Sequence, residues 1–113
     1  ELDLNEYQSF DEVMQRYPDG VFFFCTTKAK HTYSDVRYTD YADKDIFLVF
    51  GKETKGLPEE LLAEHYESCI RIPMKEHMRS LNLSNSVAII AYEVLRQFGF
   101  EHLKQDGELT KQH

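Results

Sequence analysis

The chain has 113 residues, of which 42% are hydrophobic, and its formal net charge is −7. This length and composition are typical of one domain with a hydrophobic core, so residues 1–113 are expected to form a single domain. No hydrophobic run approaches the roughly 18 residues of a transmembrane helix, the acidic N-terminus is unlike a signal peptide, and the negative charge is unlike a generic nucleic-acid binder.

The cysteines and histidines give no sign of a metal site. Cys25 and Cys69 stand alone, and each lies in or beside a hydrophobic run, which favours buried free thiols and a reducing, cytoplasmic location. The five histidines lack the spacing of metal ligands. We therefore expect no metal, with His31, His65 and His77 at the surface.

The first part of the chain predicts a helix followed by a buried strand. Ser9 and Glu12 have the spacing of a capping box, so a short helix is expected to end at about Arg16. After a turn at residues 18–20, residues 21–26 form a continuous hydrophobic run. Because this run does not alternate with polar residues, it indicates a strand covered on both faces, as in a parallel sheet.

Residues 28–44 are polar and predict a loop or an irregular stretch with one helical turn. Tyr33, Tyr38 and Tyr41 lie among basic residues in this stretch. These rings could stack on nucleic-acid bases. Alternatively, they pack on the edge of the domain, and both interpretations stay open.

Two further strands are predicted at residues 45–50 and 69–72, which are again hydrophobic. Between them, residues 51–56 form a turn, and residues 57–60 begin a helix with a proline and two acids in the first turn. Pro73 ends the third strand because it cannot donate to a sheet.

A long helix is predicted from Leu83 to Phe98, and Gly99 is expected to end it. Its hydrophobic residues extend almost all round the cylinder, with Tyr92 on or near the covered face, so more than one side must be covered. A homodimer through this helix is the natural cover. Residues 101–113 are polar and are expected to form a frayed tail.

Two strings of residues follow predicted strands, where open α/β sheets bind ligands. The first runs from Gly51 to Gly56 and has a glycine at each end. Glycines suit tight turns and the close approach of a ligand, but Leu57 follows where a phosphate-binding loop needs Lys, so this string alone is a weak signal.

The second string is Ile72-Pro73-Met74, followed after a short spacer by Ser80-Leu81-Asn82-Leu83-Ser84. Its first part offers a hydrophobic wall and main-chain groups to an adenine, and its second part offers small polar groups at the start of a helix. Asn82 or Ser84 could also simply cap that helix, and one residue can do both.

Taken together and in this order, the two strings resemble the second and third motifs of the SPOUT ribose methyltransferases. The resemblance covers the chain from Phe10 to Gly99. It implies an α/β fold, with a parallel sheet, helices on both faces and a C-terminal deep trefoil knot. It also implies S-adenosylmethionine as cofactor. The implied cofactor-binding residues are Cys25, Gly51, Ile72, Met74, Ser80 and Leu81, and the implied catalytic residues are Glu53, Ser80 and Asn82.

The same resemblance implies 2′-O-methylation of a tRNA ribose, at the anticodon wobble nucleotide. The family assigns proton removal to an Arg of its first motif, which has no counterpart here, so the chain looks like the C-terminal two-thirds of such an enzyme and is expected to be inactive alone. Two alternatives stay open: a non-catalytic knotted module for dimerisation or RNA binding, and a ribosomal RNA ribose methyltransferase.

The basic residues of the chain gather in or near the candidate site loops. They are either scattered solvated charges or a local basic rim on an acidic body. The residues concerned are Lys28, Lys30, Arg37, Lys52, Lys55, Arg71, Lys75 and Arg79.

Overall fold

The computed structural model describes residues 10–51, 56–75, 82–101, 103–107 and 109. Within them, four parallel strands form one sheet in the order β2-β4-β1-β3. The strands are β1 (Val21–Cys25), β2 (His31–Thr32), β3 (Ile46–Phe50) and β4 (Cys69–Arg71). The α-helices are α1 (Phe10–Arg16), α2 (Glu59–Glu64) and α3 (Leu83–Gln97), and the 3₁₀ turns are η1 (Tyr33–Asp35), η2 (Tyr38–Tyr41) and η3 (Tyr66–Ser68).

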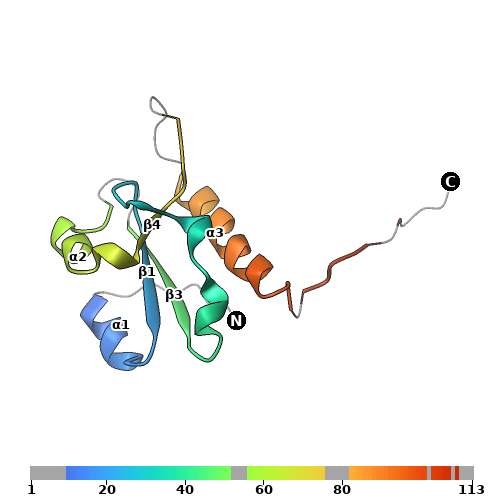
Figure 1. The fold of residues 1–113 in the computed structure, drawn as a ribbon, viewed down its shortest axis with the longest axis horizontal. Helices are drawn as coiled ribbons and strands as arrows, with labels where there is room; N and C mark the ends of the chain where they lie inside the picture. The colour runs from blue at the N-terminus through green and yellow to red at the C-terminus, as the bar shows by residue number, and fades with distance from the viewer. Residues whose placement is uncertain (1–9, 52–55, 76–81, 102, 108, 110–113) are drawn as a thin grey trace.

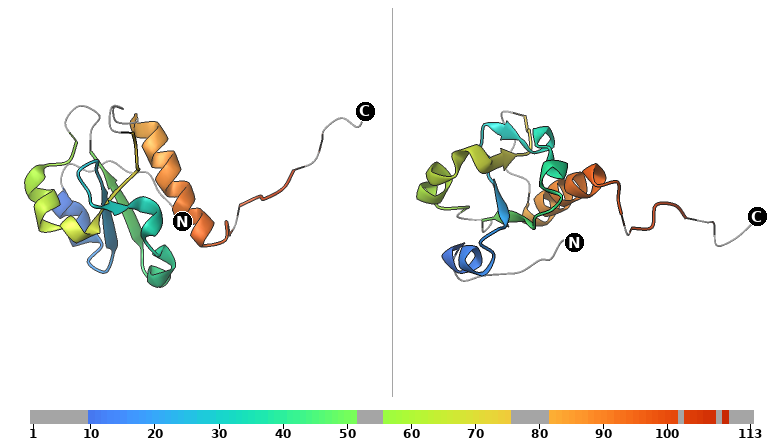
Figure 2. Two further views of the ribbon diagram at one scale, coloured as in Figure 1. Left: turned by 45° about the horizontal axis from the view of Figure 1, so that its top comes forward. Right: turned by 60° about the horizontal axis from the view of Figure 1, so that its bottom comes forward.

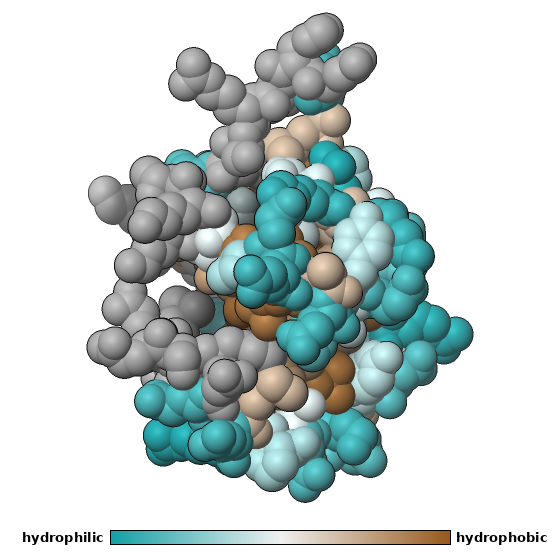
Figure 3. Space-filling view, turned by 90° about the vertical axis from the view of Figure 1, so that its left-hand side faces the viewer, coloured by the Kyte–Doolittle hydropathy of each residue, from teal (hydrophilic) through white to brown (hydrophobic). Residues whose placement is uncertain are grey.

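Helices cover both faces of the sheet, as the hydrophobic runs predicted (Figures 1 and 2). Successive strand residues point to opposite faces, so Phe22 and Phe24 join the core under α1 and α2, whereas Phe23 joins the core under α3. The face that carries α1 and α2 is mostly hydrophilic outside, with hydrophobic residues visible near its centre (Figure 3). The predicted parallel α/β class is therefore confirmed.

The main elements agree with the prediction to within two residues at the ends that the structure describes, and the largest difference is α2, which begins at Glu59 with Pro58 as its N-cap. Residues 28–44 do not agree. This stretch contains β2, which pairs with β4 through His31 and Thr32, and two 3₁₀ turns. A strand of two polar residues has no periodicity to detect, because its partner is distant in the sequence.

Tyr38 is the largest fully buried side chain among the described residues, at 0% exposure. Its hydroxyl donates to the carbonyl of Tyr33 at 2.7 Å, and its ring meets Phe23 edge-on at 5.3 Å between centroids. Tyr38 is therefore a core residue, and neither packing at the domain edge nor base stacking describes it. His65 also differs from expectation, because it is half-buried and stacks on Phe24.

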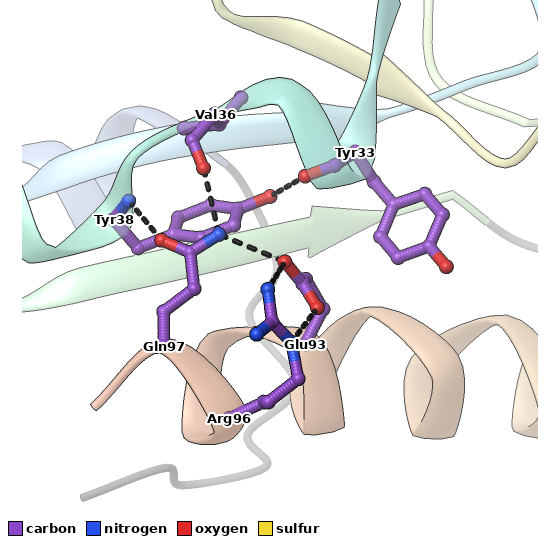
Figure 4. A network of polar contacts seen from close by, with 6 residues as sticks. All are labelled: Tyr33, Val36, Tyr38, Glu93, Arg96 and Gln97. Carbon is purple, nitrogen blue, oxygen red and sulfur yellow. Dashed lines mark hydrogen bonds and ion pairs between the residues drawn. The ribbon is translucent and has the colours of Figure 1, made fainter. Parts of the chain in front are cut away.

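A polar network joins α3 to the loop that contains Val36 and Tyr38 (Figure 4). The amide of Gln97 accepts from the Tyr38 N–H and donates to the carbonyl of Val36, both at 2.8 Å. Gln97 also donates to Glu93, which Arg96 binds with two nitrogens. The polar residues late in this helix therefore face the chain's own loop.

Both ends of α3 are capped. The Asn82 side chain accepts from the Asn85 N–H at 2.8 Å, so the predicted cap at residue 82 is confirmed. At the other end Gly99 has a φ of +75°, and hydrogen bonds run from Gly99 N to Arg96 O and from Phe100 N to Leu95 O. This is a Schellman motif, as expected for glycine after a helix.

Residues 103–107 have no regular secondary structure and are exposed, and the chain leads away from the body there (Figure 1). Within the described residues, no helix is both long and hydrophobic enough to cross a membrane.

Candidate functional site

The loops after β1, β3 and β4 meet the start of α3 at the carboxyl edge of the sheet. They surround an open depression of about 400 Å³. Ligands of open α/β sheets bind at this edge, and the volume falls within the usual range for small-molecule sites.

Five of the residues proposed from the sequence line this depression together: Cys25, Gly51, Ile72, Met74 and Asn82. They come from four separate segments of the chain, so the fold brings together what the sequence holds far apart. Glu53, Ser80 and Leu81 lie outside the described residues.

The inner wall of the depression is hydrophobic. Phe50, Ile70 and Ile90 line it and also belong to the core cluster under α3. Such a wall suits the flat face of a nucleobase, and the main-chain groups of the surrounding turns are available for its polar edge.

Both cysteines are free thiols, but they lie differently. Cys69 is buried, whereas Cys25 is half-buried and lines the depression. Burial raises the pKa of the Cys25 thiol far above its ordinary value, and the neighbouring Cys69 adds to the effect. Cys25 therefore stays a neutral thiol and is unsuited to act as a nucleophile.

Gly51 is required by the packing of its own loop. A Cβ at this position would lie 2.2 Å from the carbonyl carbon of Gly56 and 2.5 Å from the nitrogen of Leu57. Gly51 therefore lies so close to the backbone of Gly56 and Leu57 that only glycine fits there.

The turn after β1 is held by several hydrogen bonds. Thr26 N donates to the carbonyl of Ile70 at 3.0 Å, and Lys28 N donates to the Thr26 hydroxyl at 3.1 Å. The Arg71 guanidinium donates to the carbonyl of Thr27 at 2.9 Å. These bonds fix one wall of the depression to the adjacent strand β4.

Sequence reasoning assigned no role in the cofactor site to Arg71 and Ser86, which also line the depression. Ser86 lies one helical turn after Asn82, and Arg71 directly precedes Ile72. Because Asn82 and Ile72 were already proposed for the site, these positions could have predicted that Ser86 and Arg71 also line it. Arg71 is the one charged side chain among the described lining residues. Within the described residues, no group of three or more His, Cys, Asp or Glu could hold a metal ion.

Comparison with known proteins supports the resemblance drawn from the two loop strings. Residues 1–92 match the SpoU rRNA Methylase family. A Listeria monocytogenes serotype 4b (strain F2365) protein, provisionally named a tRNA (cytidine(34)-2'-O)-methyltransferase, is 52% identical over 103 residues, covering 91% of this chain and 60% of that protein. The chain therefore spans about 60% of the length of this curated relative.

Solved structures give the same picture. One, described as "Structural insights into the 2-OH methylation of C/U34 on tRNA", matches with a TM-score of 0.70 and 32% identity over 84% of this chain and 59% of that chain. The SpoU methyltransferase AviRb from Streptomyces viridochromogenes, in complex with the cofactor AdoMet, matches with a TM-score of 0.66 and 26% identity over 80% of this chain and 35% of that chain.

Proposed function

Because the chain belongs to the SpoU rRNA Methylase family, we propose that it forms the cofactor-binding part of an enzyme that methylates the 2′-hydroxyl of a tRNA ribose. The observation that carries this proposal is the convergence of Cys25, Gly51, Ile72, Met74 and Asn82 on one depression. The methyl donor is S-adenosylmethionine, whose sulfonium supplies the electrophile when it is bound. The relatives' names favour tRNA, and specifically nucleotide 34, over ribosomal RNA.

The depression fits this cofactor. Its hydrophobic wall can hold the adenine, and the backbone at Cys25, Gly51 and Ile72 can bind the polar edges, with Met74 in the same lining. We assign Ser80 and Leu81, which lie outside the described residues, to the same cofactor site. The chain's task in catalysis is to orient the ribose hydroxyl in line with the methyl group and to assist removal of its proton. We assign orientation to Asn82, Ser80 and Glu53, and the Arg of the family's first motif is expected to take the proton.

Two features of the expected fold belong to the same proposal. Family membership favours a deep trefoil knot formed by the site loops. It also favours a homodimer through α3, in which Tyr92 is buried. In the chain by itself Tyr92 is 58% exposed and Ala88, one turn earlier, is exposed too, so this side of α3 is available for a second copy. A cytoplasmic location follows from a tRNA substrate.

Methyl transfer from labelled S-adenosylmethionine to bulk tRNA, followed by nucleoside mapping, tests the function directly. The complete gene product is expected to label a 2′-O-methylated nucleoside at the wobble position. Labelling of ribosomal RNA alone would favour the ribosomal alternative, and cofactor binding or dimerisation without transfer to any RNA would favour a non-catalytic module. The described part of the site supports cofactor binding because it has the volume and hydrophobic wall of a small-molecule site.

A further inference from the structure

One corner of the molecule beside the cofactor depression combines basic side chains with an exposed aromatic ring. It consists of Lys28, Lys30 and His31 after β1 and of Tyr66 and Glu67 in η3, and we refer to it as the basic corner. Thr27, which lines the depression, directly precedes Lys28. The basic corner is therefore adjacent to the depression.

The ring of Tyr66 is anchored and partly open. Its hydroxyl donates to the carbonyl of Lys28 at 3.0 Å, and the residue is 38% exposed. The Lys30 ammonium lies over one face of the ring, 5.6 Å from its centre. A fixed, partly exposed ring with a lysine next to it is a usual platform for an unpaired base and its phosphates.

Acidic residues pair with these side chains. Glu67 pairs with Lys30 at 2.6 Å and with His31 at 3.2 Å, and Glu59 pairs with Lys28 at 2.9 Å. The Lys30 and Glu67 side chains are 50% and 75% exposed. Ion pairs this exposed contribute little stability, so a polyanion can replace the carboxylates at small cost.

We propose that the basic corner binds the RNA substrate, with Tyr66 stacking on a base and Lys28 and Lys30 contacting phosphates, and that Glu67 weakens this binding by competing for Lys30 and His31. This inference rests on the proposed function, since it assumes an RNA substrate. RNA is favoured over a protein partner because the ring and the lysines together match a base and its phosphates. In this proposal Glu67 holds the Lys30 side chain in position and also limits the affinity for RNA.

The test measures tRNA affinity of the complete gene product by fluorescence anisotropy at several salt concentrations. Lys30→Gln is expected to weaken binding about 3- to 10-fold and to reduce the slope of log K against log salt by about 1, the value for one lost phosphate contact. Lys44→Gln makes the same charge change at the amino edge of the sheet, beside Asp43 and Asp45, and should leave affinity unchanged.

Glu67→Gln provides the sharper test, because it is expected to strengthen tRNA binding by about 3-fold or more through release of Lys30 and His31. Asp43→Asn is its matched control at the amino edge of the sheet and should have no effect. In the double variant with Lys30→Gln, the gain from Glu67→Gln should shrink. Tyr66→Leu should weaken binding more than Tyr66→Phe, which keeps the ring.

Several outcomes would overturn the inference. One is a Lys30→Gln variant that binds tRNA as tightly as the Lys44→Gln variant, and another is weaker binding after Glu67→Gln. A third is a Lys30→Gln variant that loses binding to poly-glutamate but keeps its affinity for tRNA, which would mean that the basic corner binds an acidic protein. Methyl transfer by the wild type separates this inference from the proposed function. If the wild type methylates tRNA but the variants bind tRNA normally, only the role of the basic corner is wrong. A wild type that neither binds nor methylates tRNA contradicts both proposals.

Discussion

The main-chain N–H of Tyr38 donates to the side-chain oxygen of Gln97 at 2.8 Å, across 59 positions of sequence. The side-chain nitrogen of Gln97 donates to the carbonyl of Val36. The Gln97 side chain therefore pairs with both a donor and an acceptor of the loop that contains Val36 and Tyr38. These hydrogen bonds fix the last turn of α3 against the loop in which Tyr38 lies. Since the start of α3 lines the depression, the orientation of the helix bears on the shape of the site.

Replacing Gln97 by Leu should lower the free energy of unfolding by about 2 kcal/mol or more, because it leaves a partly buried N–H and carbonyl without partners. Urea unfolding followed by circular dichroism measures the effect. Asn85→Gln is the control at an exposed position of the same helix, where the expected change is below about 1 kcal/mol. Equal losses in the two variants would contradict the structural role of Gln97.

Asn82 combines a capping role with a place in the depression, and two substitutions separate these. Asn82→Ala should cost about 1 kcal/mol of stability through loss of the cap. Asn82→Asp keeps the capping oxygen but removes the amide donor, so stability should be retained while methyl transfer falls at least about tenfold, or 1.4 kcal/mol of barrier. Full activity in the Asp variant would mean that Asn82 is only a cap.

Strands β1, β3 and β4 and the edge of the site could be predicted from the sequence because each rests on local chemistry. Phe22, Phe23 and Phe24 form a run that only a strand covered on both sides can bury, and Ile72-Pro73-Met74 ends such a run at the ligand-binding edge. These signals need no knowledge of distant partners.

Other features depend on contacts between distant segments and could not be predicted. Tyr38 lies in a polar stretch, and its burial follows from Gln97 and Phe23, which are far away in sequence. β2 exists only through its pairing with β4. The steric need for Gly51 likewise depends on how the turn closes on Gly56.

The two thiols and Tyr38 should make the protein sensitive to alkaline pH. Burial raises the pKa of Cys25, Cys69 and Tyr38, so the unfolded chain releases these protons more readily than the folded chain. The contribution of these three groups to stability should be constant below about pH 8 and fall as pH rises past the ordinary thiol pKa of about 8.5. Urea unfolding between pH 7 and 10 checks this.

A cysteine substitution isolates the thiol contribution. Cys25→Ala is expected to unfold at lower urea concentration at all pH values but to lose less stability between pH 8 and 10 than the wild type. Iodoacetamide should label neither thiol at pH 7.5 until the chain unfolds. An unchanged alkaline slope in the Cys25→Ala variant would show that this thiol does not titrate on unfolding.

The proposed homodimer predicts an effect at Tyr92. Tyr92→Glu would place a charge in a buried interface and should cost several kcal/mol of association, so sedimentation should show dissociation at micromolar concentration. Met14→Glu on α1, where Met14 is 38% exposed, is the control and should stay associated. A wild type that sediments as a monomer at these concentrations would rule out the dimer.

The central claim is that the depression at the carboxyl edge of the sheet holds the cofactor, and calorimetric titration with S-adenosylhomocysteine tests it most directly. The wild type should bind one molecule per chain. Ser86→Leu, which extends a side chain into the depression, should weaken binding at least tenfold, whereas Asp43→Leu at the amino edge of the sheet should bind like the wild type. Unchanged affinity in Ser86→Leu, or no binding by the wild type, would contradict the account.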